Sequence, residues 1–107
     1  MLLLLDECVP RRFARDLAGL DARHVVDMGW SGVKNGRLLQ LMIAAGFDGL
    51  VTTDTNLARQ QSITGSGMYL VVVRARSNRI DDLRPLATEV LRVIAFAQPG
   101  RAYTVGA

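Results

Sequence analysis

The sequence predicts an α/β fold with three layers, in which helices cover both faces of a mostly parallel sheet of four to five strands. Residues 1–7 hold four consecutive leucines followed by two acids, and a short unbroken apolar run is typical of a strand buried on both faces. Two later runs, residues 49–53 and 68–73, have the same character, and helical patterns separate them. Strands that alternate with helices through right-handed crossovers build this type of sheet.

The composition predicts one domain spanning residues 1–107, because half of the 107 residues are hydrophobic. The single cysteine, Cys8, excludes an internal disulfide and favours an intracellular protein. Because no apolar stretch approaches membrane-spanning length and no basic residues precede the opening leucines, we expect a cytoplasmic domain without a membrane partner. All basic residues except Lys34 are arginines. This bias suits phosphate contact, although GC-rich coding produces it too.

After the opening strand, the first helix is expected to begin at Pro10, which suits the first helical position, with Phe13 and Leu17 on its buried side. Residues 22–28 are expected to form the second strand. Its histidine, His24, has no catalytic partner motif in the sequence and is interpreted as structural.

Residues 29–36 are predicted to form a loop, because glycines and polar residues dominate them. Asn35 is placed to cap a helix that begins near Gly36, and Gly46 is placed to end it. Residues 49–53 follow as the third strand. A short helix over residues 55–62 is then expected before the strand at 68–73.

The last helix has the clearest pattern in the chain, with apolar residues at alternating steps of three and four over residues 83–94. Pro85 lies in or near its first turn, so the pattern leaves its start open. Asp81 and Asp82 precede it, and their negative charges are expected to interact favourably with the positive end of the helix dipole, in a capping role. Residues 102–105 are expected to add an edge strand.

Acidic residues follow the first and the third predicted strands. If these strands are neighbours, Asp6 and Asp54 converge at the carboxyl edge of the sheet, where open α/β sheets bind ligands, and Glu7 lies beside them. Crowded carboxylates favour a cation between them, and their hard oxygens select Mg²⁺ or Mn²⁺. Such a metal suits phosphoryl transfer, because it neutralises charge on a phosphodiester and lowers the pKa of an attacking water.

Two other interpretations of these acids stay open. Phosphoacceptor receiver domains also carry paired acids after the first strand and an aspartate after the third, but they require a lysine after the last strand, and the only lysine here is Lys34. Alternatively, Asp6 and Asp54 only cap helices and turns.

Several motifs follow one another in the chain: Leu4-Leu5-Asp6-Glu7-Cys8-Val9-Pro10, Gly29-Trp30-Ser31-Gly32, Lys34-Asn35-Gly36, Phe47-Asp48, and Thr52-Thr53-Asp54-Thr55-Asn56-Leu57 with Gln60-Gln61. In this order, over nearly the whole chain, they resemble the short PIN-like proteins of unknown function. Those proteins are considered toxins of bacterial toxin–antitoxin pairs and are distantly similar to VapC-type ribonucleases.

The resemblance implies a PIN-like sheet and a metal-dependent endoribonuclease of a type II toxin–antitoxin pair. Its catalytic and metal-binding residues would be Asp6, Glu7 and Asp54, with Mg²⁺ or Mn²⁺ as cofactor and Thr53, Asn56 and Asn35 in support. Its partners would be RNA and a cognate antitoxin, expected to be a small DNA-binding protein. A homodimer is also considered.

One departure from the pattern concerns Arg37, which stands where such proteins usually have an acid. A cation there would repel a metal ion, so the alternative function is a catalytically impaired PIN-like module that binds an antitoxin or nucleic acid. Five basic residues are expected to hold phosphates: Arg11, Arg12, Lys34, Arg37 and Arg59.

Overall fold

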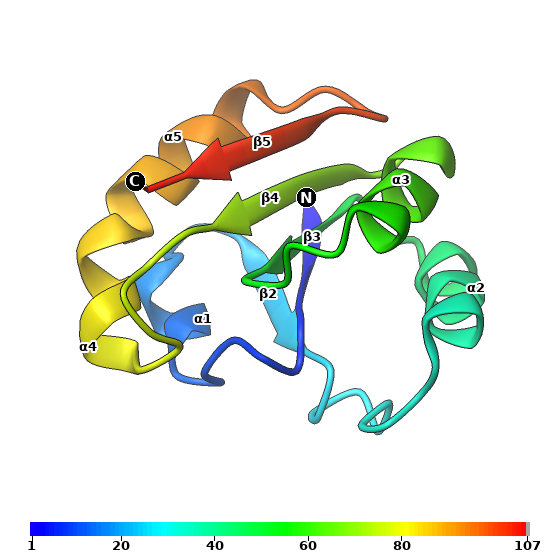
Figure 1. Ribbon diagram of the computed structural model, residues 1–107, viewed down its shortest axis with the longest axis horizontal. Helices are drawn as coiled ribbons and strands as arrows, with labels where there is room; N and C mark the ends of the chain where they lie inside the picture. The colour runs from blue at the N-terminus through cyan, green and yellow to red at the C-terminus, as the bar shows by residue number, and fades with distance from the viewer. Residues whose placement is uncertain (107) are drawn as a thin grey trace.

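Five parallel strands form the centre of the protein in the computed structural model, which describes residues 1–106 and has the strand order β2-β1-β3-β4-β5 (Figure 1). The strands are β1 (Leu2–Leu5), β2 (Asp21–His24), β3 (Gly49–Thr52), β4 (Tyr69–Val73) and β5 (Ala102–Val105). The helices are α1 (Phe13–Asp16), α2 (Asn35–Ala45), α3 (Leu57–Gly65), α4 (Ile80–Leu83) and α5 (Ala87–Phe96), with a 3-10 turn, η1 (Arg84–Leu86), between the last two.

Strand β1 occupies a central position in this sheet. It pairs in parallel with β2, where Leu4 lies opposite Arg23, and with β3, where Leu5 lies opposite Val51. Residues 3–5 are fully buried, because both faces of the strand are covered. The first and third predicted strands are therefore neighbours, which meets the condition set above for Asp6 and Asp54 to converge.

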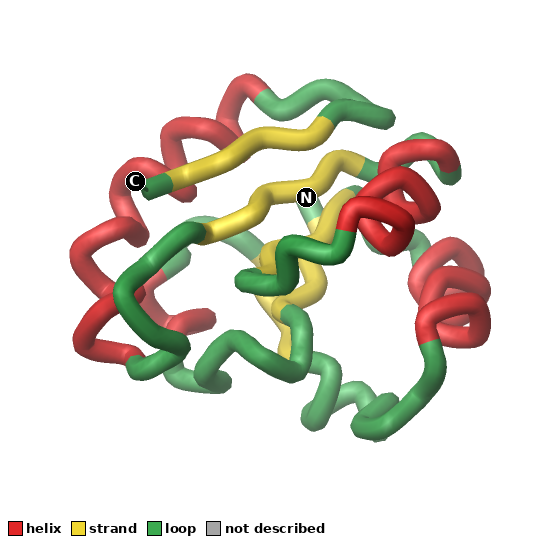
Figure 2. The backbone as a smooth tube through the Cα atoms, viewed as in Figure 1, coloured by secondary structure: helices red, strands yellow, loops and turns green. Residues whose placement is uncertain are grey.

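Helices cover both faces of the sheet (Figure 2). On one face α1, α4 and α5 pack through residues such as Phe13 and Ile94, and on the other α2 and α3 pack through residues such as Met42 and Ile63. Successive strand residues point to opposite faces and so feed the two cores alternately. The predicted three-layer α/β fold is confirmed. No helix within residues 1–106 is long and apolar enough to cross a bilayer.

The first and last helices differ from the sequence expectation. Helix α1 begins at Phe13, because Pro10 lies in the preceding turn and its carbonyl oxygen accepts a hydrogen bond from Phe13 N at 3.0 Å. The expected single helix over residues 83–94 is divided into α4, η1 and α5. Pro85 lies inside η1 and has no N–H to donate, which accounts for the break.

Strand β2 ends at His24, so the expected strand over residues 22–28 is too long. A turn follows, in which Met28 N donates to the carbonyl oxygen of His24 at 3.1 Å. The His24 ring is buried, with Nε2 2.6 Å from the carbonyl oxygen of Val9 and Nδ1 accepting from Val26 N at 3.0 Å. The two ring nitrogens therefore tie this turn to the segment that follows β1.

Helix α2 starts one residue earlier than expected, at Asn35, and its N-cap is Lys34, whose side chain makes no capping hydrogen bond. The predicted cap role of Asn35 is therefore wrong. The helix ends as predicted at Gly46, which adopts the left-handed conformation (φ 80°) that glycine allows.

Candidate functional site

The parallel pairing of β1 with β3 brings Asp6 and Asp54 to the same edge of the sheet. Asp6 directly follows β1, and its backbone N–H donates to the carbonyl oxygen of Val51 in β3 at 2.9 Å. Asp54 lies two residues beyond the end of β3. Asp6 is only 6% exposed, whereas 39% of the Asp54 side chain is exposed.

Thr52 links the two aspartates. Its hydroxyl donates to Asp6 Oδ2 at 2.7 Å and accepts from Asp54 N at 3.0 Å. Sequence reasoning named Thr53 instead and missed this residue. Leu4 and Leu50 belong to the same core, so they point to the same face of the sheet. Because strand side chains alternate between faces, Asp6 and Thr52, each two residues further along its own strand direction, are expected on that face too. This alternation could have identified Thr52.

Arg59 of α3 lies between the two carboxylates. Its Nη1 donates to Asp6 Oδ2 at 2.5 Å and to Asp54 Oδ2 at 3.1 Å, and its Nη2 donates to Asp6 Oδ1 at 2.8 Å. The arginine side chain is only 10% exposed. One guanidinium group thus neutralises much of the charge of two aspartates that come from different strands.

The start of α3 explains how Arg59 reaches them. Asn56 is the N-cap, and its Oδ1 accepts from Arg59 N at 3.0 Å, which places Arg59 in the first turn of the helix. Side chains on a helix lean toward its N-terminus. In addition, Asp54 Oδ1 accepts from Asn56 N at 2.9 Å, so the loop between strand and helix is fixed at both ends.

The pKa of Asp6 reflects two opposed effects. Burial raises it, but the hydrogen bonds from Arg59 and Thr52 together with the arginine charge outweigh burial, so the pKa lies below the ordinary value of 3.8. The hydrogen bond to Asp6 in turn raises the pKa of Arg59. The two groups therefore form a stable ion pair at neutral pH.

Glu7 does not join this ion-pair cluster. Its Oε1 accepts from Ser31 Oγ at 2.7 Å and from Gly32 N at 2.9 Å. The Ser31 hydrogen bond is the main cause that lowers the pKa of this exposed carboxylate. Glu7 thus ties the turn after β1 to the loop before α2.

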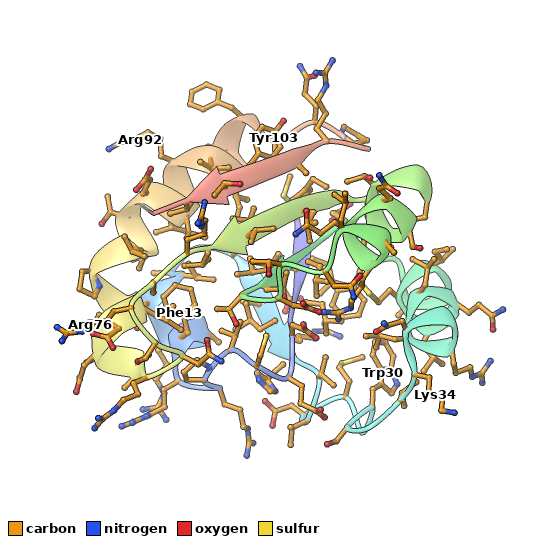
Figure 3. All side chains as sticks on the ribbon, viewed as in Figure 1. Phe13, Trp30, Lys34, Arg76, Arg92 and Tyr103 are labelled. Carbon is orange, nitrogen blue, oxygen red and sulfur yellow. The ribbon has the colours of Figure 1, made fainter. Side chains whose placement is uncertain are left out.

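A pocket of about 520 Å³ opens at this edge of the sheet. The side chain of Trp30 lies on one side of it, near the start of α2, and packs edge to face on Phe47 with 5.8 Å between the ring centres (Figure 3). The lining includes all three acids, Asp6, Glu7 and Asp54, and also Cys8, Gly32, Asn35, Thr53, Thr55, Arg59 and Asn78.

The basic residues expected to hold phosphates lie in different places. Arg59 lines the pocket but is paired with both aspartates. Arg11 forms an ion pair with Asp27 outside the pocket. Arg12, Lys34 and Arg37 are exposed and do not line the pocket.

Arg37, the residue expected to oppose a metal ion, does not touch the acids. Its Nη1 lies 3.5 Å from Gln40 Oε1, one turn along α2. The cation that contacts Asp6 and Asp54 is Arg59, and sequence reasoning gave Arg59 only a phosphate role. The signal for its contact with the acids is its position in the first turn after the Asn56 cap.

Asp6 and Asp54 supply carboxylate oxygens, the type of ligand that a hard divalent cation prefers. Asp6 and Asp54 each direct an oxygen at one positively charged nitrogen, and Mg²⁺ commonly uses one or two protein carboxylates and keeps several waters. A metal ion at this point would have to displace Arg59. No group of three or more His, Cys, Asp or Glu side chains within residues 1–106 could hold a metal, which agrees with Glu7 being bonded to the loop.

Comparison of the chain with protein-family models, with curated proteins and with solved structures found no match. The candidate site therefore rests on the geometry of this chain.

Proposed function

We propose that the protein is a PIN-like ribonuclease that hydrolyses RNA phosphodiesters with Mg²⁺ or Mn²⁺. The observation that carries the proposal is the convergence of Asp6 Oδ2 and Asp54 Oδ2 on one cationic nitrogen, at 2.5 and 3.1 Å. Two carboxylates at the carboxyl ends of neighbouring parallel strands, at the mouth of a polar pocket, are suited to a metal-assisted reaction.

In this proposal Asp6 and Asp54 hold the metal. When bound, the metal supplies charge neutralisation on the phosphodiester and a water of lowered pKa. Glu7 lines the same pocket and would orient that water as a hydrogen-bond acceptor. Its lowered pKa makes it a weak base, so it is less suited to removing the proton. Thr53 and Asn35 line the pocket and donate hydrogen bonds to the RNA backbone.

Arg59 has two roles in the proposed cycle. Without a metal, its guanidinium group keeps Asp6 charged and holds both aspartates in place. If a metal displaced it from the aspartates, the Arg59 guanidinium could pair with an RNA phosphate in the bidentate way that arginine favours.

The role as toxin of a type II toxin–antitoxin pair, with a small DNA-binding antitoxin as partner, belongs to the same proposal. It is supported by the sequence motifs that resemble PIN-like toxins.

A second candidate function is a catalytically silent module that binds an antitoxin or nucleic acid. The specific observation in its favour is again Arg59, which occupies both Asp6 oxygens and an Asp54 oxygen. If the Arg59 guanidinium always takes the place of a metal ion, the two aspartates need no metal to balance their charge, and the protein has no metal-dependent activity.

Cleavage of a labelled single-stranded RNA with Mn²⁺ tests the proposal. We expect cleavage by the native protein, loss of at least about a hundredfold for Asp54→Asn, and native rates for Glu89→Gln, an exposed acid on α5. Cleavage that survives Asp54→Asn would reject the assignment.

The response of the native protein to Mn²⁺ separates the two candidate functions, and Arg59→Gln shows whether the arginine competes with the ion. In the ribonuclease, the variant binds Mn²⁺ more tightly because the competing cation is gone, and the native protein already cleaves. In the silent module, the native protein neither binds Mn²⁺ nor cleaves.

A further inference from the structure

A smaller pocket of about 220 Å³ adjoins the candidate site at the carboxyl end of β4. It shares Thr53, Thr55 and Asn78 with the larger pocket, so the two pockets adjoin, and we refer to the pair as the hollow. Val73, Arg74 and Ala75 complete its lining. The hollow therefore runs from the aspartates at β1 and β3 to the loop that follows β4.

The two parts of this hollow differ in charge. The larger pocket contains three carboxylates, Asp6, Glu7 and Asp54, against the single guanidinium of Arg59. The smaller pocket contains Arg74 and no acidic side chain. An anion is therefore repelled from the first part, unless a metal is bound, and attracted to the second.

The polar groups of the smaller pocket are unused. Within residues 1–106, Arg74 forms no ion pair, whereas Arg11, Arg23 and Arg84 each pair with an aspartate. Over the same residues no side-chain hydrogen bond involves Thr53, Thr55 or Asn78. Hydroxyl, amide and guanidinium donors around the acid-free smaller pocket suit the oxygens of a phosphate.

The loop that carries Arg74 and Asn78 is fixed at both ends. Arg74 N donates to the carbonyl oxygen of Val105 in β5 at 2.7 Å. Further along, Ser77 Oγ donates to Asp82 Oδ2 at 2.5 Å and accepts from Arg79 N at 3.1 Å. The pocket is thus preformed, which reduces the ordering that binding requires.

We infer that the smaller pocket, which contains Arg74, is a phosphate subsite. It would hold the RNA strand next to the phosphodiester that lies at Asp6 and Asp54. The choice of RNA rests on the proposed function, since the smaller pocket adjoins that site. Arg74 is suited to this role because its charge is free, while that of Arg59 is neutralised by the aspartates.

Binding of a fluorescein-labelled octaribonucleotide, followed by anisotropy in EDTA at 50–200 mM KCl, tests the inference. We expect Arg74→Gln to weaken binding about five- to tenfold and to reduce the slope of log affinity against log salt by about 0.7, as loss of one phosphate contact on a single strand predicts. Because Arg74 is exposed and unpaired within residues 1–106, the Arg74→Gln variant should fold like the native protein, as circular dichroism would verify.

Two arginines provide matched controls. Arg76 belongs to the same loop but points outward beside α4, and Arg92 lies on α5 (Figure 3). Neither lines either pocket, so Arg76→Gln and Arg92→Gln should keep the native affinity and salt slope. The inference is overturned if the native protein does not bind the oligonucleotide, if Arg74→Gln binds as well as native, or if the controls lose as much.

This experiment is independent of cleavage, because EDTA removes the metal. Binding that depends on Arg74 without any cleavage in Mn²⁺ would reject the ribonuclease and keep the subsite. Cleavage with a native KM in Arg74→Gln would reject the subsite and keep the ribonuclease.

Discussion

Arg59 holds Asp6 by two hydrogen bonds, of 2.5 Å from Nη1 to Oδ2 and 2.8 Å from Nη2 to Oδ1, across 53 residues of sequence. Paired bonds of this kind are among the strongest polar contacts in proteins. Because both side chains are nearly buried, the contact is shielded from water, and removing one partner leaves the other charge buried and unpaired. The stability of the fold and the state of the candidate site therefore depend on the same contact.

Arg59→Gln should lower the free energy of unfolding by about 3 kcal/mol in EDTA, the loss expected when one partner of a buried ion pair is removed. Urea titration measures this change. Arg92→Gln, which removes an exposed arginine of α5, should change stability by less than about 0.5 kcal/mol. Equal losses in the two variants would show that the Asp6 ion pair contributes little.

Mn²⁺ should restore part of the stability lost in Arg59→Gln, because a ligand that binds only the folded state stabilises it. The midpoint of thermal unfolding should rise more for this variant than for the native protein at the same Mn²⁺ concentration. No rise for Arg59→Gln would mean that Asp6 and Asp54 do not bind the ion even when they are vacant.

Acid should weaken the native protein through Asp6. Its pKa is lower in the folded state than the ordinary value of 3.8, so its contribution is complete above that value and is lost as the pH falls below it. Arg59→Gln removes the hydrogen bonds and the charge of Arg59, so only Thr52 and the Glu7 backbone still oppose burial, and the pKa of Asp6 is higher than in the native protein. Acidification therefore costs this variant less stability. The stability difference between the two proteins, measured by urea titration at pH 7 and pH 3.5, should therefore shrink on acidification.

Asn56→Ala should destabilise the protein by about 1 kcal/mol, because Asn56 caps α3 through the hydrogen bond from Arg59 N. Asn56→Asp keeps an acceptor at the cap and should retain native stability. Chemical denaturation of the two variants provides the measurement. A loss as large in Asn56→Asp as in Asn56→Ala would indicate that the cap is not the source of the effect.

Gly49→Ala should destabilise the protein by about 3 kcal/mol or more, because a Cβ at this position would lie 2.3 Å from the buried ring of Tyr69. Gly36→Ala serves as the control, because no atom lies within 4 Å of a Cβ there and alanine favours the helix. Thermal unfolding should give a lower midpoint for Gly49→Ala and an unchanged or higher midpoint for Gly36→Ala.

The sheet could be predicted from the sequence because each strand is marked by a short apolar run of adjacent residues. The four leucines of residues 2–5 are confirmed as a buried parallel strand, and the run at 49–53 as its neighbour. This pairing alone places Asp6 and Asp54 at one edge. Helix boundaries were less readable, because the apolar spacing of residues 83–94 continues through a segment that Pro85 divides.

The contact of Arg59 with the acids was not readable, because it depends on where α3 begins and on the reach of a long side chain across two strands. Residues 55–62 were expected to be helical, whereas Asn56 caps a helix that starts at Leu57. That shift places Arg59 in the first turn, above the ends of β1 and β3. Side-chain direction, and not the hydrophobic pattern, decides this contact.

In the proposed function, Asp6 and Asp54 share a divalent ion in place of Arg59. A crystal structure of the native protein grown in Mn²⁺, with anomalous diffraction recorded for manganese, tests it directly. We predict an anomalous peak between the two carboxylates and an Arg59 guanidinium turned away from them. An Arg59 still bonded to both aspartates, with no manganese between them, would contradict the account.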